Sequence, residues 1–367
     1  MRKCFAILLA VCLSFLMLPL HVHADVVYDE TISALLAGSE ETSLLPDGDL
    51  TDPAVLTGIG LQDLLEKLGA MLRTESTAPL QTLMLLFGVI LLSSLAQSLR
   101  QGEGVGTVYE CICALCAVGL ISTPMTAVFE RAASVLSRTS DFMLGFTGIY
   151  GGVIAVSGGV STAALYQGSM AVVCEVALEI STKLIFPLLS MSLAMSIVDA
   201  VNPAVALSGL IGMIHKVTAW VLGLLMAAFL GLLSVQSMVT AAADRAGTKA
   251  AKYVISGAVP IVGGAVSDAY AAVLGSMGVL RSGTGMAGIL LLLSILLPVI
   301  LSLGLYRLIV MAAGAAAELF GVPTLTRLFK NLETVLATGF SAAVCFGVMF
   351  VFSTAVLMLI GTNAMGG

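Results

Sequence analysis

Long apolar stretches separated by short polar segments occupy the chain from residue 80 onward. A membrane-spanning helix needs about 20 consecutive apolar residues, because the hydrocarbon core of a bilayer is roughly 30 Å thick. The pattern therefore predicts an all-α, polytopic membrane helix bundle with about eight spans, the fourth containing a potential break at Pro187. The predicted spans are 80–99, 108–129, 142–162, 170–198, 204–239, 253–275, 286–314 and 334–360.

The segment before Pro79 has a different pattern, because its apolar residues recur at helical spacing instead of filling a continuous run. Charged residues lie on the side opposite Leu61, Leu64, Leu65, Leu68 and Leu72. Asp52 and Pro53 suit the N-cap and the first position of a helix. We therefore predict that 25–79 forms a short helical head in front of a multi-span membrane domain, 80–367.

The first residues predict a secretory signal peptide over 1–24. Arg2 and Lys3 form its charged start, residues 5–20 its apolar stretch, and 22–24 a small-residue cleavage site. An uncleaved first membrane helix is the alternative, but an apolar run of roughly 16 residues is short for a span. In both cases the head is exported, which places it on the extracytoplasmic side.

Composition and charge agree with a membrane protein. The chain is 59% hydrophobic and 10% charged, whereas a soluble domain carries about 25% charged residues. The net charge of −6 arises in the head, which contains eleven acidic residues and only two basic ones, Lys67 and Arg73. With the head outside, alternation of the spans puts a basic cluster of Arg245, Lys249 and Lys252 on the cytoplasmic side. There it would anchor the chain at the anionic inner leaflet, as the positive-inside rule requires.

Few residues suit catalysis or metal binding. The cysteines of "CICALC", residues 111–116, have a spacing that resembles a metal site, but they lie in an apolar stretch where cysteine acts as a small hydrophobe. His215 is the only histidine after the signal segment. "GTGMAG", residues 283–288, matches a dinucleotide-binding pattern, but no strand is predicted before it. We therefore expect no enzymatic activity, no catalytic residue, no cofactor, no metal and no nucleic-acid partner.

Ionisable residues inside predicted spans are the strongest candidates for function. Glu175, Glu179 and Lys183 repeat every four residues and so share one helix face. A charge at the bilayer centre costs about 3 kcal/mol or more, so this face must point into the bundle or towards water. The row either lines a polar pathway or a subunit contact, or forms a charge pair that locks helices together near a membrane end.

Asp268 is a second intramembrane candidate, within the predicted span 253–275. A helix there would carry one stripe of small or polar residues, made of Lys252, Ser256, Pro260, Gly264 and Asp268. Pro260, Gly263 and Gly264 are candidates for a hinge or break, so the segment either crosses the membrane or re-enters it. The alternative is a packing stripe, in which small residues let a neighbouring helix approach.

A weak internal repeat suggests a second architecture. "SGGVSTAALYQGSM" at 157–170 resembles "VGGAVSDAYAAVLGSM" at 262–277. If 142–239 and 253–360 each hold three spans, the copies are inverted relative to each other, as in secondary transporters. Chance similarity in a sequence rich in Gly, Ala and Val explains the match equally well. A stand-alone secondary transporter is therefore the alternative function.

Residues 236–289 are similar to a known family, the stage III sporulation protein AE (SpoIIIAE) family of endospore-forming bacteria. The similarity rests on the "GSMG" at 275–278 and on Asp244, Lys249, Lys252, Pro260, Gly263, Gly264, Ser267 and Asp268. The order of signal peptide, short exported head and multi-span body also resembles the family. The resemblance offers no catalytic residues to assign.

What the resemblance implies is a structural and transport role. The expected function is an integral membrane subunit of the channel complex, secretion-like in type, that joins the mother cell and the forespore during endospore development. The chain would act there as a membrane platform or gated pore. It would lie as a multi-pass protein in the mother-cell membrane facing the forespore. Its expected partners are membrane lipid and other membrane proteins of that complex, and a homo-oligomer is compatible with this role.

Overall fold

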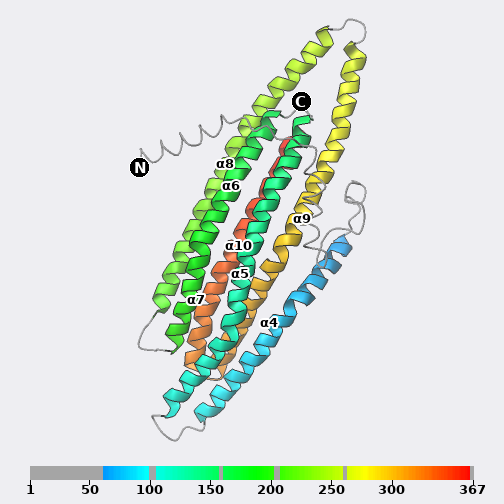
Figure 1. The fold of residues 1–367 in the computed structure, drawn as a ribbon. Coiled ribbons are helices and arrows are strands. Elements are labelled where there is room, and N and C mark those ends of the chain that lie inside the picture. Colours follow the sequence, from blue (N-terminus) through cyan, green and yellow to red (C-terminus); the bar gives the residue numbers. More distant parts are fainter. Residues whose placement is uncertain (1–60, 99–104, 157–159, 202–206, 259–262, 364–367) are drawn as a thin grey trace, which may run out of the picture.

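The computed structural model describes residues 61–98, 105–156, 160–201, 207–258 and 263–363 (Figure 1). Within them every regular element is a helix, which confirms the predicted all-α class. The elements are α4 (Leu61–Ser98), α5 (Val105–Val156), α6 (Val160–Ile180), η1 (Ser181–Ile185), α7 (Phe186–Val201), α8 (Ser208–Ala258), α9 (Gly263–Leu319) and α10 (Pro323–Asn363). Among the described residues, five helices are long and apolar enough to cross a membrane, in agreement with a membrane helix bundle. These candidate spans are Leu65–Gln97, Cys111–Gly148, Ser208–Val235, Gly288–Leu319 and Pro323–Ala355.

α5 joins two predicted spans into one helix. Its 52 residues contain 108–129 and most of 142–162, and the predicted outer loop between them is helical. Residues 130–141, "ERAASVLSRTSD", contain no glycine or proline and several good helix formers, so nothing in them ends the helix. At about 1.5 Å per residue α5 is roughly 78 Å long, more than twice the thickness of a bilayer core.

The predicted break at Pro187 is a change of helix type instead of an interruption. α6 continues through the π-helical η1 directly into α7, which begins at Phe186. Proline lacks the N–H that would bond to the carbonyl of Lys183, four residues earlier. The π-helical turn just before Pro187 accommodates that missing bond, so 170–198 remains one continuous helical run.

The predicted span 253–275 is not one helix. α8 ends at Ala258 and α9 begins at Gly263, while Pro260 lies outside the described residues. A proline disfavours helical conformation in the residue before it, and glycines give the backbone extra freedom. Pro260, Gly263 and Gly264 together therefore favour a helix end at this point.

α4 runs without interruption through Pro79, the residue predicted to separate the head from the membrane domain. The candidate span Leu65–Gln97 therefore includes the last part of the predicted head. The limits of the head and the repeats 142–239 and 253–360 stay predictions. The signal segment 1–24 lies outside the described residues.

A tight turn joins α9 to α10. Gly321 has a φ of 69°, in the left-handed region that favours glycine. The N–H of Val322 donates to the carbonyl of Ala317 at 2.9 Å, and the N–H of Gly321 donates to that of Glu318 at 3.1 Å. This is a Schellman motif, and Pro323 then starts α10 with a favourable φ. The two helices consequently run antiparallel along one another (Figure 1).

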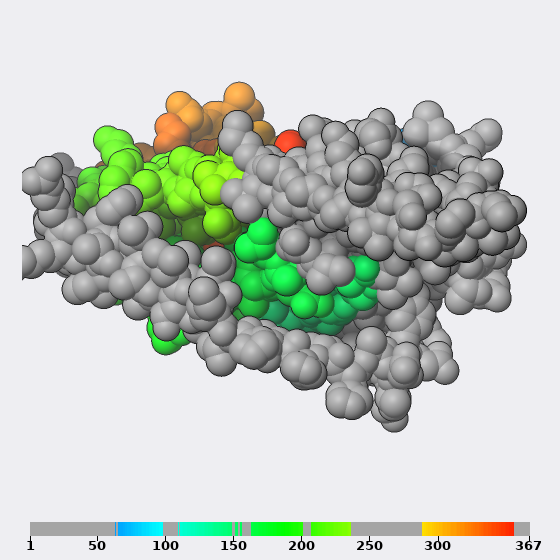
Figure 2. All heavy atoms as spheres, turned by 90° about the horizontal axis from the view of Figure 1, so that it is seen from above, coloured from blue at the N-terminus to red at the C-terminus, as the bar shows by residue number. Residues whose placement is uncertain are grey.

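The α9–α10 hairpin forms the centre of the bundle. α4 and α5 pack against α9, while α7 and α8 pack against α10. Seen from above, the yellow-green atoms of α8 lie between the green atoms of α6 and orange atoms of the α9–α10 hairpin (Figure 2).

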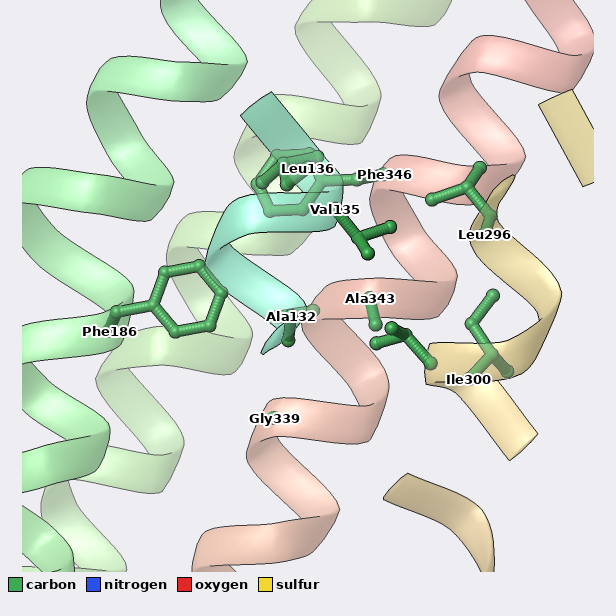
Figure 3. Close-up of a pocket in the computed structure, with 11 residues that line it drawn as sticks. Ala132, Val135, Leu136, Phe186, Leu296, Ile300, Gly339, Ala343 and Phe346 are labelled. Atoms are coloured by element: carbon green, nitrogen blue, oxygen red, sulfur yellow. The ribbon is translucent and has the colours of Figure 1, made fainter. Parts of the chain in front are cut away.

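The described core is closely filled where α5, α7, α9 and α10 meet. The cavity at this point measures about 20 Å³, which is room for about one water molecule. Its walls are apolar and include Leu136, Phe186, Leu296, Ala343 and Phe346 (Figure 3). Packing of this density leaves no room for a solute larger than water between the described side chains of these four helices at this point.

Candidate functional site

The charged row, defined as Glu175, Glu179 and Lys183, lies on the outer face of the described bundle. The Nζ of Lys183 donates to Oε1 of Glu179 at 2.6 Å, and their side chains are 71% and 47% exposed. Glu175, one turn earlier, is exposed as well. The ion pair joins two residues of one helical run, so it does not lock two helices of this chain together.

Apolar side chains surround the charged row on the same exposed surface. Val172, Val176 and Leu184 are each at least one-third exposed. An apolar outer surface suits lipid, whereas three ionisable groups within it cost about 3 kcal/mol or more each if they face hydrocarbon. The arrangement therefore favours contact with water or with another protein at this place, in line with the predicted subunit contact.

η1 makes the local backbone at the charged row irregular. The hydroxyl of Ser181 donates to the carbonyl of Ala177, and the Oγ1 of Thr182 donates to that of Leu178 at 2.6 Å. These bonds give the widened turn two side-chain donors for carbonyls of the preceding turn. π-helical turns of this kind occur frequently at functional sites.

The remaining predicted site residues fall where no side chain is described. α8 contains the basic cluster Arg245, Lys249 and Lys252, and α9 contains Gly263, Gly264 and Asp268. The structure gives the backbone of these residues but does not describe their surroundings, and Pro260 lies outside the described residues altogether. Their roles as cytoplasmic anchor, hinge and pore candidate stay predictions.

A buried carboxylate outside the predicted sites links three helices. Asp199, at the end of α7, is 1% exposed. Its Oδ1 accepts a hydrogen bond from the N–H of Leu207 at 2.7 Å, next to the start of α8. Its Oδ2 accepts one from Nδ2 of Asn331 in α10 at 2.8 Å. A single acid between an apolar run and Asn202–Pro203 was the available signal, and it is typical of a loop.

Ion pairs between helices are made by other residues than the charged row. Arg131 of α5 donates two hydrogen bonds to the Glu75 carboxylate of α4, at 2.9 and 2.7 Å. Bidentate Arg–carboxylate pairs are among the stronger hydrogen-bonded ion pairs in proteins. The Glu75 side chain is only 11% exposed. Arg307 lies 3.6 Å from Glu333 across the α9–α10 hairpin.

Comparison with known proteins supports the resemblance drawn from residues 236–289. The family model for stage III sporulation protein AE matches residues 57–361. Stage III sporulation protein AE of Bacillus subtilis (strain 168) is 24% identical over 287 residues, which are 78% of this chain and 72% of that relative. No solved structure matches the chain. The family model covers most of the chain, including the charged row, Asp199 and the five candidate spans of the described part, so this membrane protein belongs to the stage III sporulation protein AE family.

Proposed function

We propose that the chain is an integral membrane subunit of a secretion-like channel complex between mother cell and forespore, required for endospore development. Membership of the sporulation family and the five membrane-capable helices among the described residues support this role. The subunit works through structure and transport and catalyses no reaction. It lies in the mother-cell membrane with its head on the extracytoplasmic side, facing the forespore, and its partners are other membrane proteins of the complex.

One observation carries the proposal: the charged row is exposed on the outer face of the bundle, while the core between α5, α7, α9 and α10 is closely packed. A solute passing between α5, α7, α9 and α10 would have to push aside Phe186 and Phe346, which line a space of only about 20 Å³. The charged row, in contrast, is available to a neighbouring subunit. The chain therefore acts as a platform, and the conduit forms between subunits instead of inside one bundle.

Deletion of the gene tests the biological role. Forespores lacking the protein are expected to stop developing after engulfment, because the conduit cannot assemble. The measurement is the yield of heat-resistant spores together with microscopy of engulfed forespores. A normal spore yield would contradict the role. Solute flux through the purified chain alone in liposomes would instead support a stand-alone transporter with inverted repeats.

Neutralising the charged row tests the subunit contact. In the variant Glu175→Gln/Glu179→Gln/Lys183→Gln, we expect affinity for the neighbouring subunit to fall on the order of tenfold or more. The variant removes the charges that would pair with groups of that subunit once the interface is buried. The thermal midpoint of the isolated chain stays near that of the wild type, since exposed ion pairs contribute little to stability. Cross-linking and co-purification from sporulating cells measure the association.

The matched control places the same number of neutral substitutions on exposed residues of α5. Glu130→Gln/Arg138→Gln/Asp141→Asn removes two acids and one base, as the row variant does, and all three side chains are exposed. We expect this control to assemble and sporulate normally. Equal assembly of the row variant and the wild type would remove the charged row from the subunit contact.

A further inference from the structure

A cavity of about 600 Å³ opens beside the α9–α10 turn, at the end of the bundle where α8 begins. Its volume lies within the range of roughly 300–1,000 Å³ that is usual for small-ligand sites. The side chains that give it chemistry are Ser208, Glu318, Thr326, Arg327, Lys330 and Asn331. It belongs neither to the charged row nor to the packed core.

The cavity has a surplus of positive charge. Arg327 is exposed, and within the described part of the chain no carboxylate lies at ion-pair distance from it. Lys330 is one turn further along α10, with its Nζ 3.3 Å from Oε2 of Glu318, and both of these side chains are about two-thirds exposed. The lining therefore holds two basic side chains and one acidic side chain, and the acidic one is paired with only one of the two.

Two helices begin at the wall of the cavity and add partial positive charge. α10 starts at Pro323 and α8 at Ser208, and residues of both starts line the space. The first N–H groups of a helix have no partner within the helix, and the helix dipole makes this end attractive to anions. The dipoles and the basic side chains consequently act in the same direction.

The floor of the cavity is fixed before any ligand arrives. Asn331 is 7% exposed and donates to the buried Asp199, which also holds Leu207 at the start of α8. Both carboxylate oxygens of Asp199 thus accept hydrogen bonds from N–H donors. Gly321, which also lines the cavity, is held in place by the Schellman motif. A site that is already formed loses less entropy on binding.

The place of the cavity in the fold indicates what it binds. It lies at the turn between two candidate spans, Gly288–Leu319 and Pro323–Ala355, where a bilayer has its headgroups. Basic side chains at the end of a span attract the phosphate-bearing headgroups of anionic lipids. We propose that this cavity binds a phosphate group, carried by an anionic lipid or by a soluble phosphate compound.

The test measures binding of phosphatidylglycerol, phosphatidylcholine and inorganic phosphate to the full-length protein in detergent, by native mass spectrometry. The wild type is expected to retain phosphatidylglycerol. The variant Arg327→Gln/Lys330→Gln should bind it about tenfold or more weakly, since each basic group near the surface contributes to anionic-lipid affinity. A control that also removes two exposed positive charges, Arg73→Gln/Arg138→Gln, should bind like the wild type.

A further variant, Thr326→Glu, keeps both basic residues and puts a carboxylate into the cavity from the half-exposed first turns of α10. It should weaken binding as strongly as the double variant while the thermal midpoint stays unchanged. Displacement of the lipid by inorganic phosphate assigns the site to a soluble phosphate compound, and retention of the lipid assigns it to the headgroup. Binding that is equal in the wild type and all variants would overturn the proposal.

Discussion

Replacing Gly288 by alanine is expected to destabilise the protein by about 1–3 kcal/mol, because the new methyl group overpacks the contact between α9 and α5. A Cβ built at Gly288 would overlap the ring of Phe146. That ring is 7% exposed and stacks on Phe142, with 5.7 Å between the ring centroids. It therefore has little free space into which to move, and the two helices must separate.

The measurement is the thermal unfolding midpoint of the purified protein in a mild detergent. Gly223→Ala in α8 is the matched control, because nothing lies within 4 Å of a Cβ built at this exposed helical position. There alanine should stabilise the helix by up to about 1 kcal/mol, as its helix propensity is higher than that of glycine. If both substitutions raise the midpoint alike, α5 and α9 do not approach as closely as described.

Replacing Asp199 by alanine is the second change with a large expected effect. The substitution removes both acceptors that hold the start of α8 and the side chain of Asn331. Each buried donor left without a partner costs about 1–3 kcal/mol, so the loss should reach about 2 kcal/mol or more. The thermal midpoint should fall accordingly, and proteolysis should become faster near residues 202–206, the connection between α7 and α8.

Two further variants serve as comparisons: one removes the charge of Asp199 but keeps an acceptor oxygen, and the other removes an acid from the surface. Asp199→Asn keeps one acceptor oxygen, so its midpoint should lie between those of the wild type and the alanine variant. Asp141→Ala removes an acid from the exposed surface of α5 and should leave the midpoint nearly unchanged. An unchanged midpoint in Asp199→Ala would show that the buried link contributes nothing to stability.

The all-α membrane class and the family could be predicted from the sequence, whereas the joining of the helices could not. Apolar runs report which residues suit lipid, but 130–141 is both charged and strongly helix-forming. Charge favoured a loop there, and helix propensity prevailed. At 253–275 the difference is the opposite: the apolar run predicts one span, whereas α8 ends at Ala258 and α9 begins at Gly263. Pro260 and two glycines lie at this point, and composition alone does not weigh their effect on the backbone.

The candidate sites show the same limit at the level of side chains. A spacing of four put Glu175, Glu179 and Lys183 on one face, yet α6 is apolar on nearly every other side, so the pattern could not say which face points outward. The partner of Asp199 is Asn331, and 132 positions separate them. No local pattern reveals a hydrogen bond across that distance, and the cavity beside Arg327 depends on the same tertiary arrangement.

The turn at Gly321 has a consequence for the order of assembly in the cell. α9 and α10 adjoin in sequence, so their pairing closes only a short loop and can form soon after synthesis. α4, by contrast, is made early and packs against α9, whose chain follows more than 160 residues later. The N-terminal helices are therefore in the bilayer before their packing partners exist. The bundle can be completed only when translation has produced the α9–α10 hairpin, close to the end of the chain.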